Sequence, residues 1–299
     1  MRSNKKGIFY RDDFKDRYHT GKYSSMFDED RGYVRIEPYP TLRELEEYYE
    51  GSYFEEGDLV QHDYLNDELI YRATYLGYIK KIFPFIKTKS NVEVLEYGCG
   101  VGSFVRSLLV CDENPRIGNI DGVDLSDTAI ALAAKHTESE RANFYTLDER
   151  NLQKKYDLIA MLEVVEHIPD VQNIIKELSL NVEVGGILFI TTPNYNSFEQ
   201  RVFKESWRLF CPPEHINFFT EKTLSQMLID NGWEILKVDD EFVFSFTIGL
   251  RKKLSGVVPF FFIRMISWVK KILVYSLFNS ALRLLGFEGG KITLIAKKL

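Results

Sequence analysis

The segment NVEVLEYGCGVGSFVRSLL, residues 91–109, constrains the fold more than any other part of the chain. An apolar stretch with strand character runs into three glycines at alternate positions, and an amphipathic helical pattern follows at once. Glycines at such a turn let the backbone approach a ligand closely, while the first amides of the helix point toward that ligand. The segment therefore predicts a strand, a ligand-binding loop and a helix in immediate succession.

Strand and helix patterns alternate from this segment onward. The predicted strands are 92–96, 119–124, 143–147, 156–162, 186–192, 233–246 and 291–298. The predicted helices between them are 103–111, 127–136, 170–181 and one that starts after Thr220 and stops at Gly232. This order predicts an α/β fold with a Rossmann-like, doubly wound sheet of seven strands, mostly parallel with an antiparallel last strand.

Residues 1–88 are expected to form an N-terminal helical appendage that covers the ligand. The stretch 39–54, YPTLRELEEYYEGSYF, has apolar residues at helical spacing, and so do residues 65–83. Pro84 is expected to end the second of these helices.

Residues 89–299 are expected to form the ligand-binding domain, with an apolar and basic insertion at about 250–285. Arg264, Lys270 and Lys271 interrupt the apolar run, so it contains no uninterrupted apolar stretch of about 20 residues that could span a bilayer. Its mixture of aromatic and basic residues suits peripheral membrane contact, and the alternative is a pair of helices packed on the domain or in a homodimer.

Composition excludes several partners. The net charge of -6 carries no basic excess, which argues against nucleic acid. Three cysteines without a C-x-x-C pair predict neither a disulfide framework nor a cysteine zinc site. The start MRSNKKGIFYRDDF lacks the apolar core of a secretory signal. We therefore expect a cytoplasmic protein, with membrane association only through the insertion.

The glycine loop indicates which ligand it binds. Its spacing is G-x-G-x-G at Gly98, Gly100 and Gly102, with Glu96 two residues ahead, and it is not the dinucleotide spacing G-x-G-x-x-G. The Glu96 carboxylate would repel a pyrophosphate and attract a cation. Asp124 ends the second strand about twenty residues later, where an acid accepts both hydroxyls of a ribose. The ligand is therefore expected to be a nucleoside with a positive tail and no phosphates.

These residues resemble those of the class I S-adenosylmethionine-dependent methyltransferases. The resemblance covers residues 90–240 and includes the segments YDLIAMLEVVEHIPD, GGILFITTPN and PPEHINFFTEKTLSQMLIDNGW. These segments are similar to a small-molecule branch that includes quinone-biosynthesis O-methyltransferases and methyltransferases of surface-polysaccharide gene clusters. The resemblance implies that residues 96–102 hold the methionine part of the cofactor, Asp124 and Leu125 the ribose, and Asp148 the adenine.

A second group of residues begins where the fourth strand ends, in EVVEH. Glu163, Glu166 and His167, with His215 from a later loop, could bind Mg²⁺ or another divalent ion. A group of class I O-methyltransferases resembles this pattern and holds a metal with it. In the alternative interpretation, Glu163 lines the cofactor pocket, Glu166 caps a helix and His167 packs in the core. His215 is also predicted to be the general base for the acceptor hydroxyl, with Glu163 as a second catalytic candidate.

We therefore expect a methyltransferase that acts on a small-molecule, sugar or lipid-linked acceptor, preferentially at oxygen. Polysaccharide biosynthesis is one setting for such an activity. One rival is a nicotinamide-dependent sugar dehydrogenase or epimerase, against which the loop spacing counts. The other is a catalytically silent assembly subunit with the same fold, against which the intact Glu96, Asp124 and His215 count. Five aromatic residues suit either an acceptor wall or a packed loop: Phe203, Trp207, Phe210, Phe218 and Phe219.

Overall fold

The structure is a computed structural model that describes residues 23–41, 43–45, 68–86, 89–111, 117–149, 154–204, 207–241 and 279–299. Its strands are β1 Ser24–Asp28, β2 Tyr33–Glu37, β3 Val92–Tyr97, β4 Ile117–Asp124, β5 Ala142–Thr146, β6 Tyr156–Leu162, β7 Val182–Pro193, β8 Asn217–Phe218, β9 Trp233–Glu241 and β10 Lys291–Lys298. Its helices include α2 Glu68–Ile86, α3 Ser103–Leu109, α4 Asp127–His136, α5 Val171–Asn181, α6 Phe198–Phe203 and α7 Glu221–Asp230.

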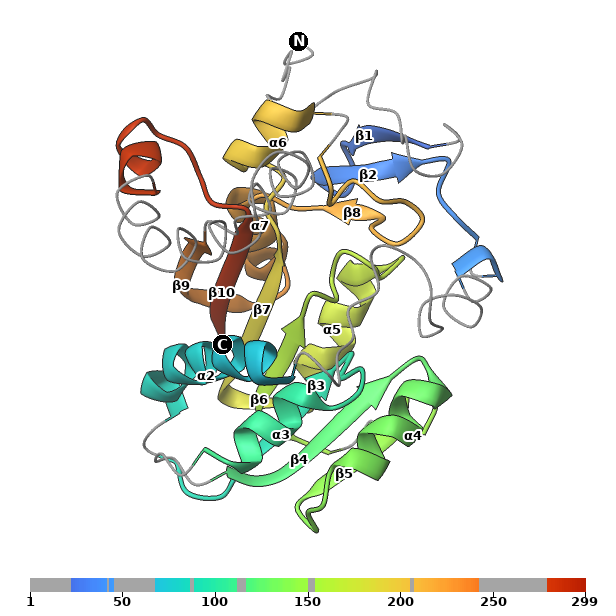
Figure 1. Ribbon diagram of the computed structural model, residues 1–299, viewed down its shortest axis with the longest axis vertical. Helices are drawn as coiled ribbons and strands as arrows, with labels where there is room; N and C mark the ends of the chain where they lie inside the picture. Colours follow the sequence, from blue (N-terminus) through green and yellow to red (C-terminus); the bar gives the residue numbers. More distant parts are fainter. Residues whose placement is uncertain are drawn as a thin grey trace, which may run out of the picture.

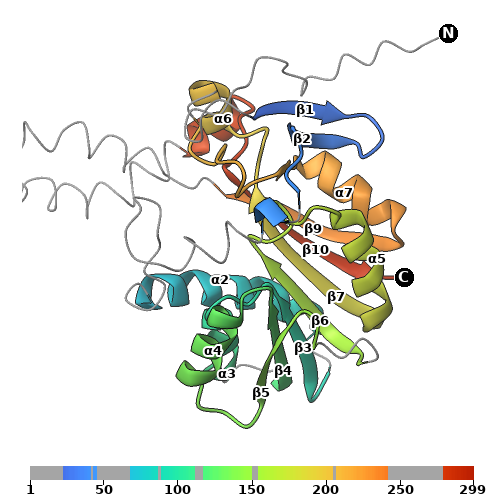
Figure 2. The ribbon, with the colours of Figure 1, turned by 90° about the vertical axis from the view of Figure 1, so that its right-hand side faces the viewer.

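A seven-stranded sheet in the order β5-β4-β3-β6-β7-β10-β9 forms the centre of the molecule (Figure 1). The first five of these strands pair in parallel, and β10 lies antiparallel between β7 and β9. Helices α2, α3 and α4 cover one face, and α5 and α7 cover the other (Figure 2). The predicted fold class is confirmed, including the antiparallel last strand.

Burial on both faces explains why the central strands are almost continuously apolar. Leu158 and Ala160 of β6 pack in the cluster that contains residues of α2 and α3, and Ile159 and Met161 pack in the cluster that contains residues of α5 and α7. All four side chains are fully buried. Alternate residues of one strand thus belong to two different layers of the core.

Helix α2 does not end at Pro84, as the sequence suggested, but continues to Ile86. A proline inside a helix removes one amide hydrogen bond and crowds the carbonyl four residues earlier. Ile82, Phe83 and Ile86 are buried against the sheet on both sides of this position. Their burial offsets the cost of the proline, and the helix extends three residues beyond the predicted end.

The N-terminal region contains a feature that its pattern did not predict. Strands β1 and β2 form an antiparallel hairpin, and β2 pairs with β8 to complete a second, three-stranded sheet. The Asp28 carboxylate accepts the amides of Asp30 and Arg31 and so shapes the hairpin turn. Of the predicted helix at 39–54, residues 43–45 are helical, while residue 42 and residues 46–67 lie outside the described chain.

The second sheet has a small core of its own. Its buried members are Tyr23, Val34, Ile36, Leu45, Tyr195, Trp207, Phe210, Ile216 and Phe218. The aromatic residues after β7 therefore pack inside the protein, with Phe219 in the main core. The burial of Trp207, Phe210, Phe218 and Phe219 agrees with the packed-loop interpretation, whereas Phe203 is only partly buried beside the small core.

Most of the insertion predicted at 250–285 lies outside the described residues, and only 279–285 can be placed. In that stretch Leu282 is buried, whereas Leu284 and Leu285 are largely exposed. None of the helices in the described part of the chain is both long and apolar enough to cross a bilayer.

Candidate functional site

The glycine loop follows β3 and adopts the left-handed backbone that its spacing requires. Gly98 has φ +77° and Gly100 has φ +50°. A Cβ on Gly98 would lie 2.5 Å from Cγ2 of Val164, whereas a Cβ on Gly100 would meet no atom within 4 Å. The loop is thus packed against the EVVEH segment at Gly98, and it leaves open space over Gly100.

Two acids flank this loop, Glu96 buried and Asp124 partly buried. Glu96 is 3% exposed, and its Oε2 atom has no hydrogen-bond partner among the described residues. Oδ2 of Asp124 accepts the Gly100 amide at 2.8 Å, and Oδ1 accepts the Ser126 amide at 3.0 Å. Burial raises the pKa of both carboxyls, despite the amides donated to them. A cationic or hydroxyl-rich ligand over the loop would satisfy these oxygens.

Leu125 and Asp148 lie at the same edge of the sheet. The Leu125 side chain is 56% exposed directly after Asp124. The Leu147 amide donates to the Asp124 carbonyl at 3.1 Å, which places the turn containing Asp148 beside the end of β4. Both side chains are exposed, so they can contact a ligand held at Asp124.

Glu163 follows β6 with φ +55°, an uncommon conformation for a residue with a side chain. Its amide donates to the Thr191 carbonyl at 3.0 Å, and its Oε1 accepts the Thr191 hydroxyl at 2.7 Å. The Lys291 ammonium lies 3.2 Å from the same oxygen. Burial opposes ionisation of Glu163, but Lys291 and Thr191 prevail and lower its pKa. Glu163 is therefore a carboxylate in an ion pair.

The structure brings together the other three residues of the predicted metal group. One ligand atom each from Glu166, His167 and His215 lies within 4.8 Å of the others. Oε2 of Glu166 accepts the Thr192 hydroxyl at 2.9 Å, while its Oε1 lies 3.9 Å from Nε2 of His167 without a hydrogen bond. Burial and the nearby Glu163 raise the Glu166 pKa well above its usual value.

Backbone carbonyls fix the orientation of both imidazoles. Nδ1 of His167 lies 2.7 Å from the Glu214 carbonyl, and Nδ1 of His215 lies 2.8 Å from the Leu209 carbonyl. A carbonyl only accepts, so each Nδ1 donates its hydrogen and each neutral ring keeps a lone pair on Nε2. Burial lowers the pKa of both rings to about 4, which keeps them neutral at pH 7. This is the ligand form of histidine, and the Glu166 Oε1 atom supplies an oxygen beside it.

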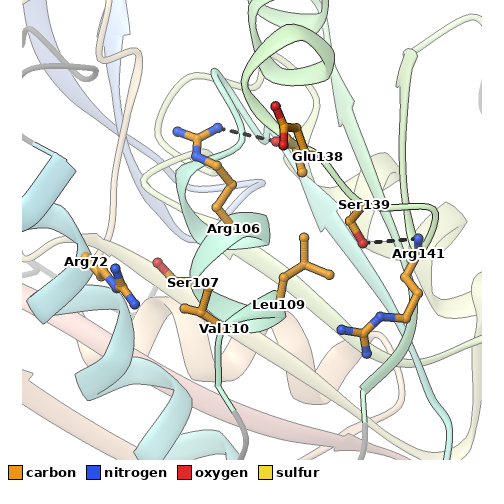
Figure 3. A pocket seen from close by; sticks show the side chains of 9 residues that line it. Arg72, Arg106, Ser107, Leu109, Val110, Glu138, Ser139 and Arg141 are labelled. Atoms are coloured by element: carbon orange, nitrogen blue, oxygen red, sulfur yellow. Dashed lines mark hydrogen bonds between the residues drawn. The ribbon is translucent and has the colours of Figure 1, made fainter.

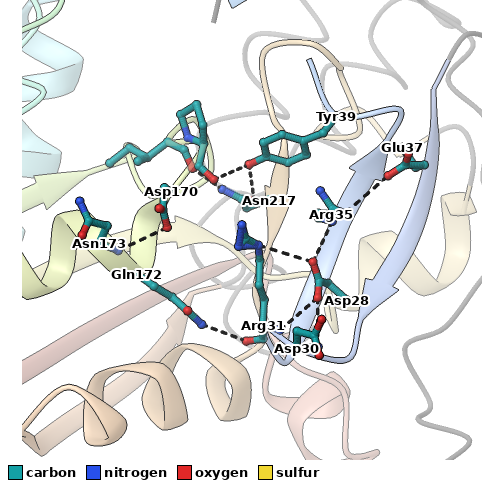
Figure 4. A network of polar contacts seen from close by, with 12 residues as sticks. Asp28, Asp30, Arg31, Arg35, Glu37, Tyr39, Asp170, Gln172, Asn173 and Asn217 are labelled. Atoms are coloured by element: carbon teal, nitrogen blue, oxygen red, sulfur yellow. Dashed lines mark hydrogen bonds and ion pairs between the residues drawn. The ribbon is translucent and has the colours of Figure 1, made fainter. Parts of the chain in front are cut away.

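The second sheet holds this segment in place (Figure 4). Nδ2 of Asn217 donates to the Ile168 carbonyl at 2.7 Å, and the Asn217 amide donates to the Glu166 carbonyl at 3.0 Å. The Tyr39 hydroxyl donates to the Pro169 carbonyl at 2.8 Å. The segment 163–170 is therefore clamped between the end of β6 and the small sheet.

Sequence reasoning missed several of these contacts. Thr191 and Thr192 appear in the predicted strand as ordinary β-branched residues, and Lys291 as the polar start of the last strand. The threonine contacts depend on the register of β7 against β6, where Thr191 pairs with Leu162. The Lys291 contact depends on the register of β10 against β7, where Lys291 pairs with Pro193. A pair of threonines at the carboxyl end of a buried strand was the one available signal.

A pocket of about 350 Å³ lies elsewhere, between α2, the end of α3 and the loop before β5 (Figure 3). Arg72, Arg106 and Arg141 line it, and Arg106 donates to the Val101 carbonyl of the glycine loop at 2.7 Å. The carboxyl ends of α3 and α4 both border this pocket, and such ends favour cations. Arg106 therefore supports the glycine loop, and Arg141 donates to the Ile117 carbonyl at the start of β4.

The chain has relatives among known proteins. A family model described as a methyltransferase domain matches residues 70–238. A ubiquinone biosynthesis O-methyltransferase of Hydrogenovibrio crunogenus is 29% identical over 175 residues, which are 52% of this chain and 70% of the relative. The enzyme of the same name from Bradyrhizobium diazoefficiens is 31% identical over 152 residues, which are 47% of this chain and 58% of the relative. Several of the curated relatives are thus matched over only about half of their length.

Solved structures share the fold at low sequence identity. The cyclase SpnF has 19% identity and a TM-score of 0.50, with 74% of this chain and 80% of that chain covered. A candidate sarcosine dimethylglycine methyltransferase from Galdieria sulphuraria has 12% identity and a TM-score of 0.50, with 77% and 86% covered.

Proposed function

The chain belongs to the methyltransferase-domain family, and we propose that it transfers a methyl group from S-adenosylmethionine to the oxygen of a small phenolic acceptor. The family indicates methyl transfer as the reaction class. It thereby argues against the nicotinamide-dependent dehydrogenase or epimerase that the sequence left as an alternative. The relatives named for ubiquinone biosynthesis support an oxygen on an aromatic ring. Sugar and lipid-linked acceptors, which the sequence also suggested, are the alternatives that the assay below separates.

The residues of the loop fit the cofactor. The unpartnered Oε2 of Glu96 and the open space over Gly100 suit a ligand with a cationic tail. Asp124 would hold the ribose hydroxyls, since each carboxylate oxygen can accept a further hydrogen bond. When bound, S-adenosylmethionine supplies a methyl group that is electrophilic because it is carried on a sulfonium.

The acceptor follows from the strength of the available base. Neutral His215 can take a proton, but with a pKa of about 4 it is a weak base. A phenol, with a pKa of about 10, gives up its proton to a weak base more easily than a sugar hydroxyl does. The weak base and the relatives named for ubiquinone biosynthesis together favour a phenol over a sugar hydroxyl.

A divalent ion is a second way to activate the same acceptor. Oε1 of Glu166 and the Nε2 atoms of His167 and His215 would hold it. Two imidazoles favour a transition metal such as Zn²⁺ or Mn²⁺ over the Mg²⁺ suggested by the sequence. An ion held there supplies Lewis acidity at the acceptor oxygen, and His215 is then a ligand instead of the base.

The test of this function is an acceptor assay. Purified protein is incubated with S-adenosylmethionine and either catechols and simple phenols or matched methyl glycosides, and S-adenosylhomocysteine is measured. We expect turnover with phenols, and a fall in kcat of about 10²–10⁴ in His215→Ala if His215 is the base. Turnover with glycosides alone would contradict the proposed acceptor.

The metal has its own test. We expect chelation to abolish activity of the wild type and added Mn²⁺ or Zn²⁺ to restore it. Glu166→Gln should lose this response, because an amide is a poorer ligand than a carboxylate. Glu177→Gln on the exposed side of α5 is the matched control and should respond like the wild type. If chelation leaves the wild type fully active, the metal is refuted and the base assignment of His215 is retained.

A further inference from the structure

Lys291 brings a positive charge to the edge of the sheet where the acceptor must lie. It is the first residue of β10, and because β10 is antiparallel to β7, its partner is Pro193 at the carboxyl end of β7. Glu163 follows the neighbouring strand β6 at the same edge. The ligand face of a parallel sheet is this carboxyl edge.

The Lys291 ammonium has two partners within the described chain. Nζ lies 3.2 Å from Oε1 of Glu163 and 3.2 Å from the hydroxyl oxygen of Tyr78, which comes from α2. An ammonium has three N–H donors, so these contacts leave one for a ligand. The side chains of Lys291 and Glu163 are 20% and 39% exposed, which leaves the pair accessible from solvent.

The ion pair stays charged in this environment. Burial disfavours the ammonium, but Glu163 and Tyr78 outweigh it and raise the pKa of Lys291. A lone ammonium would repel the sulfonium of the methyl donor, whereas the Glu163 carboxylate at 3.2 Å offsets that charge. The site can therefore offer a local positive charge without a net positive charge.

We propose that Lys291 binds the acceptor as an oxyanion, with its remaining N–H donated to the phenolate oxygen that receives the methyl group. This inference rests on the proposed function and makes it more specific. The phenol proton passes to the base of the site and then to water. The oxygen–carbon bond forms as the sulfur–carbon bond breaks, and the electron pair of the broken bond stays on sulfur. The products are the methyl ether, S-adenosylhomocysteine and one proton.

A purely structural role for Lys291 explains less. Glu163 is already fixed by two hydrogen bonds with Thr191, one from its amide and one to its side chain. Its orientation therefore does not require Lys291. At the acceptor edge, a positive charge would stabilise the phenolate that must form before the methyl group is transferred.

The test varies the acidity of the acceptor. Lys291→Met and Lys291→Gln remove the charge, and Lys291→Arg keeps it. Lys297→Met, at the other end of the same strand and paired with Glu234, is the matched control. Rates are measured with a series of substituted phenols that spans pKa values from about 7 to about 10. Affinity for S-adenosylhomocysteine serves as the check on folding.

We expect the two neutral variants to lose about 100-fold in kcat with the least acidic phenols and little with the most acidic, because a nearby ammonium lowers the pKa of a bound phenol by about two units. Lys291→Arg should recover part of this loss, and Lys297→Met should match the wild type. A loss that is equal for all phenols, or no loss, would overturn the role of Lys291 while leaving the proposed function intact. A wild type inactive toward every phenol would overturn both.

Discussion

Asp124→Ala is expected to lower the affinity for S-adenosylhomocysteine about 100-fold or more while the protein stays folded. In the proposed complex the carboxylate accepts both ribose hydroxyls, and hydrogen bonds to a charged group contribute about 1.5–3 kcal/mol each. Loss of about 3 kcal/mol corresponds to about two decades in Kd. Calorimetric titration measures the affinity directly and needs no acceptor.

Two further variants make this result interpretable. Asp124 also accepts the amides of Gly100 and Ser126. Asp124→Asn keeps one carbonyl oxygen as an acceptor and therefore shows how much of the lost affinity comes from rearrangement of the glycine loop. Asp127→Ala, exposed in the first turn of α4, is the control and should bind normally. Undiminished affinity in Asp124→Ala, with a normal thermal transition, would refute the ribose assignment.

Gly98→Ala is expected to destabilise the protein by about 2–5 kcal/mol. An L-residue in the left-handed conformation costs about 1–2 kcal/mol, and the overlap of its Cβ with Val164 adds about 1–3 kcal/mol. Denaturant unfolding of the wild type and the variant gives the difference in the free energy of unfolding.

Gly100→Ala separates the two causes, because Gly100 is also left-handed but has no atom within 4 Å of its Cβ position. It should lose only about 1–2 kcal/mol of stability, yet lose cofactor affinity, since its methyl group would occupy the space proposed for the ligand. The double variant Gly98→Ala with Val164→Ala should recover part of the stability lost at Gly98. Equal stability of the two single variants would contradict the contact with Val164.

The larger sheet could be predicted from the sequence because each of its elements has a local pattern. The strand at 156–162 and the helix at 127–136 have the predicted bounds. Short apolar strands that alternate with amphipathic helices pack as a doubly wound sheet, with helices on both of its faces. The group of Glu166, His167 and His215 was predictable for a related reason, since the segments that follow neighbouring parallel strands meet at one edge.

The remainder depends on contacts between distant parts of the chain. The hairpin of β1 and β2 was missed because few aliphatic residues mark its strands, and its stability comes from aromatic residues near 195–218. Lys291 and Glu163 are 128 positions apart in the sequence, and they meet only because β10 pairs antiparallel with β7 in a particular register. No local sequence pattern reveals the register in which these distant strands pair.

The clamp on residues 163–170 joins two structural units of unequal size. Glu166 is bonded to Thr192 of the large sheet through its side chain and to the amides of Ile216 and Asn217 beside the small sheet through its carbonyl. The glycine loop and Asp124 are bonded within the large sheet, and so are Glu163 and Lys291. Partial opening of the small aromatic core would therefore move His215 away from Glu163 and Lys291 and leave most of the glycine loop in place. Under the proposed function, such a protein would still bind S-adenosylmethionine but would lack the base or metal ligand His215, so the local stability of the small sheet would limit the fraction of molecules able to turn over.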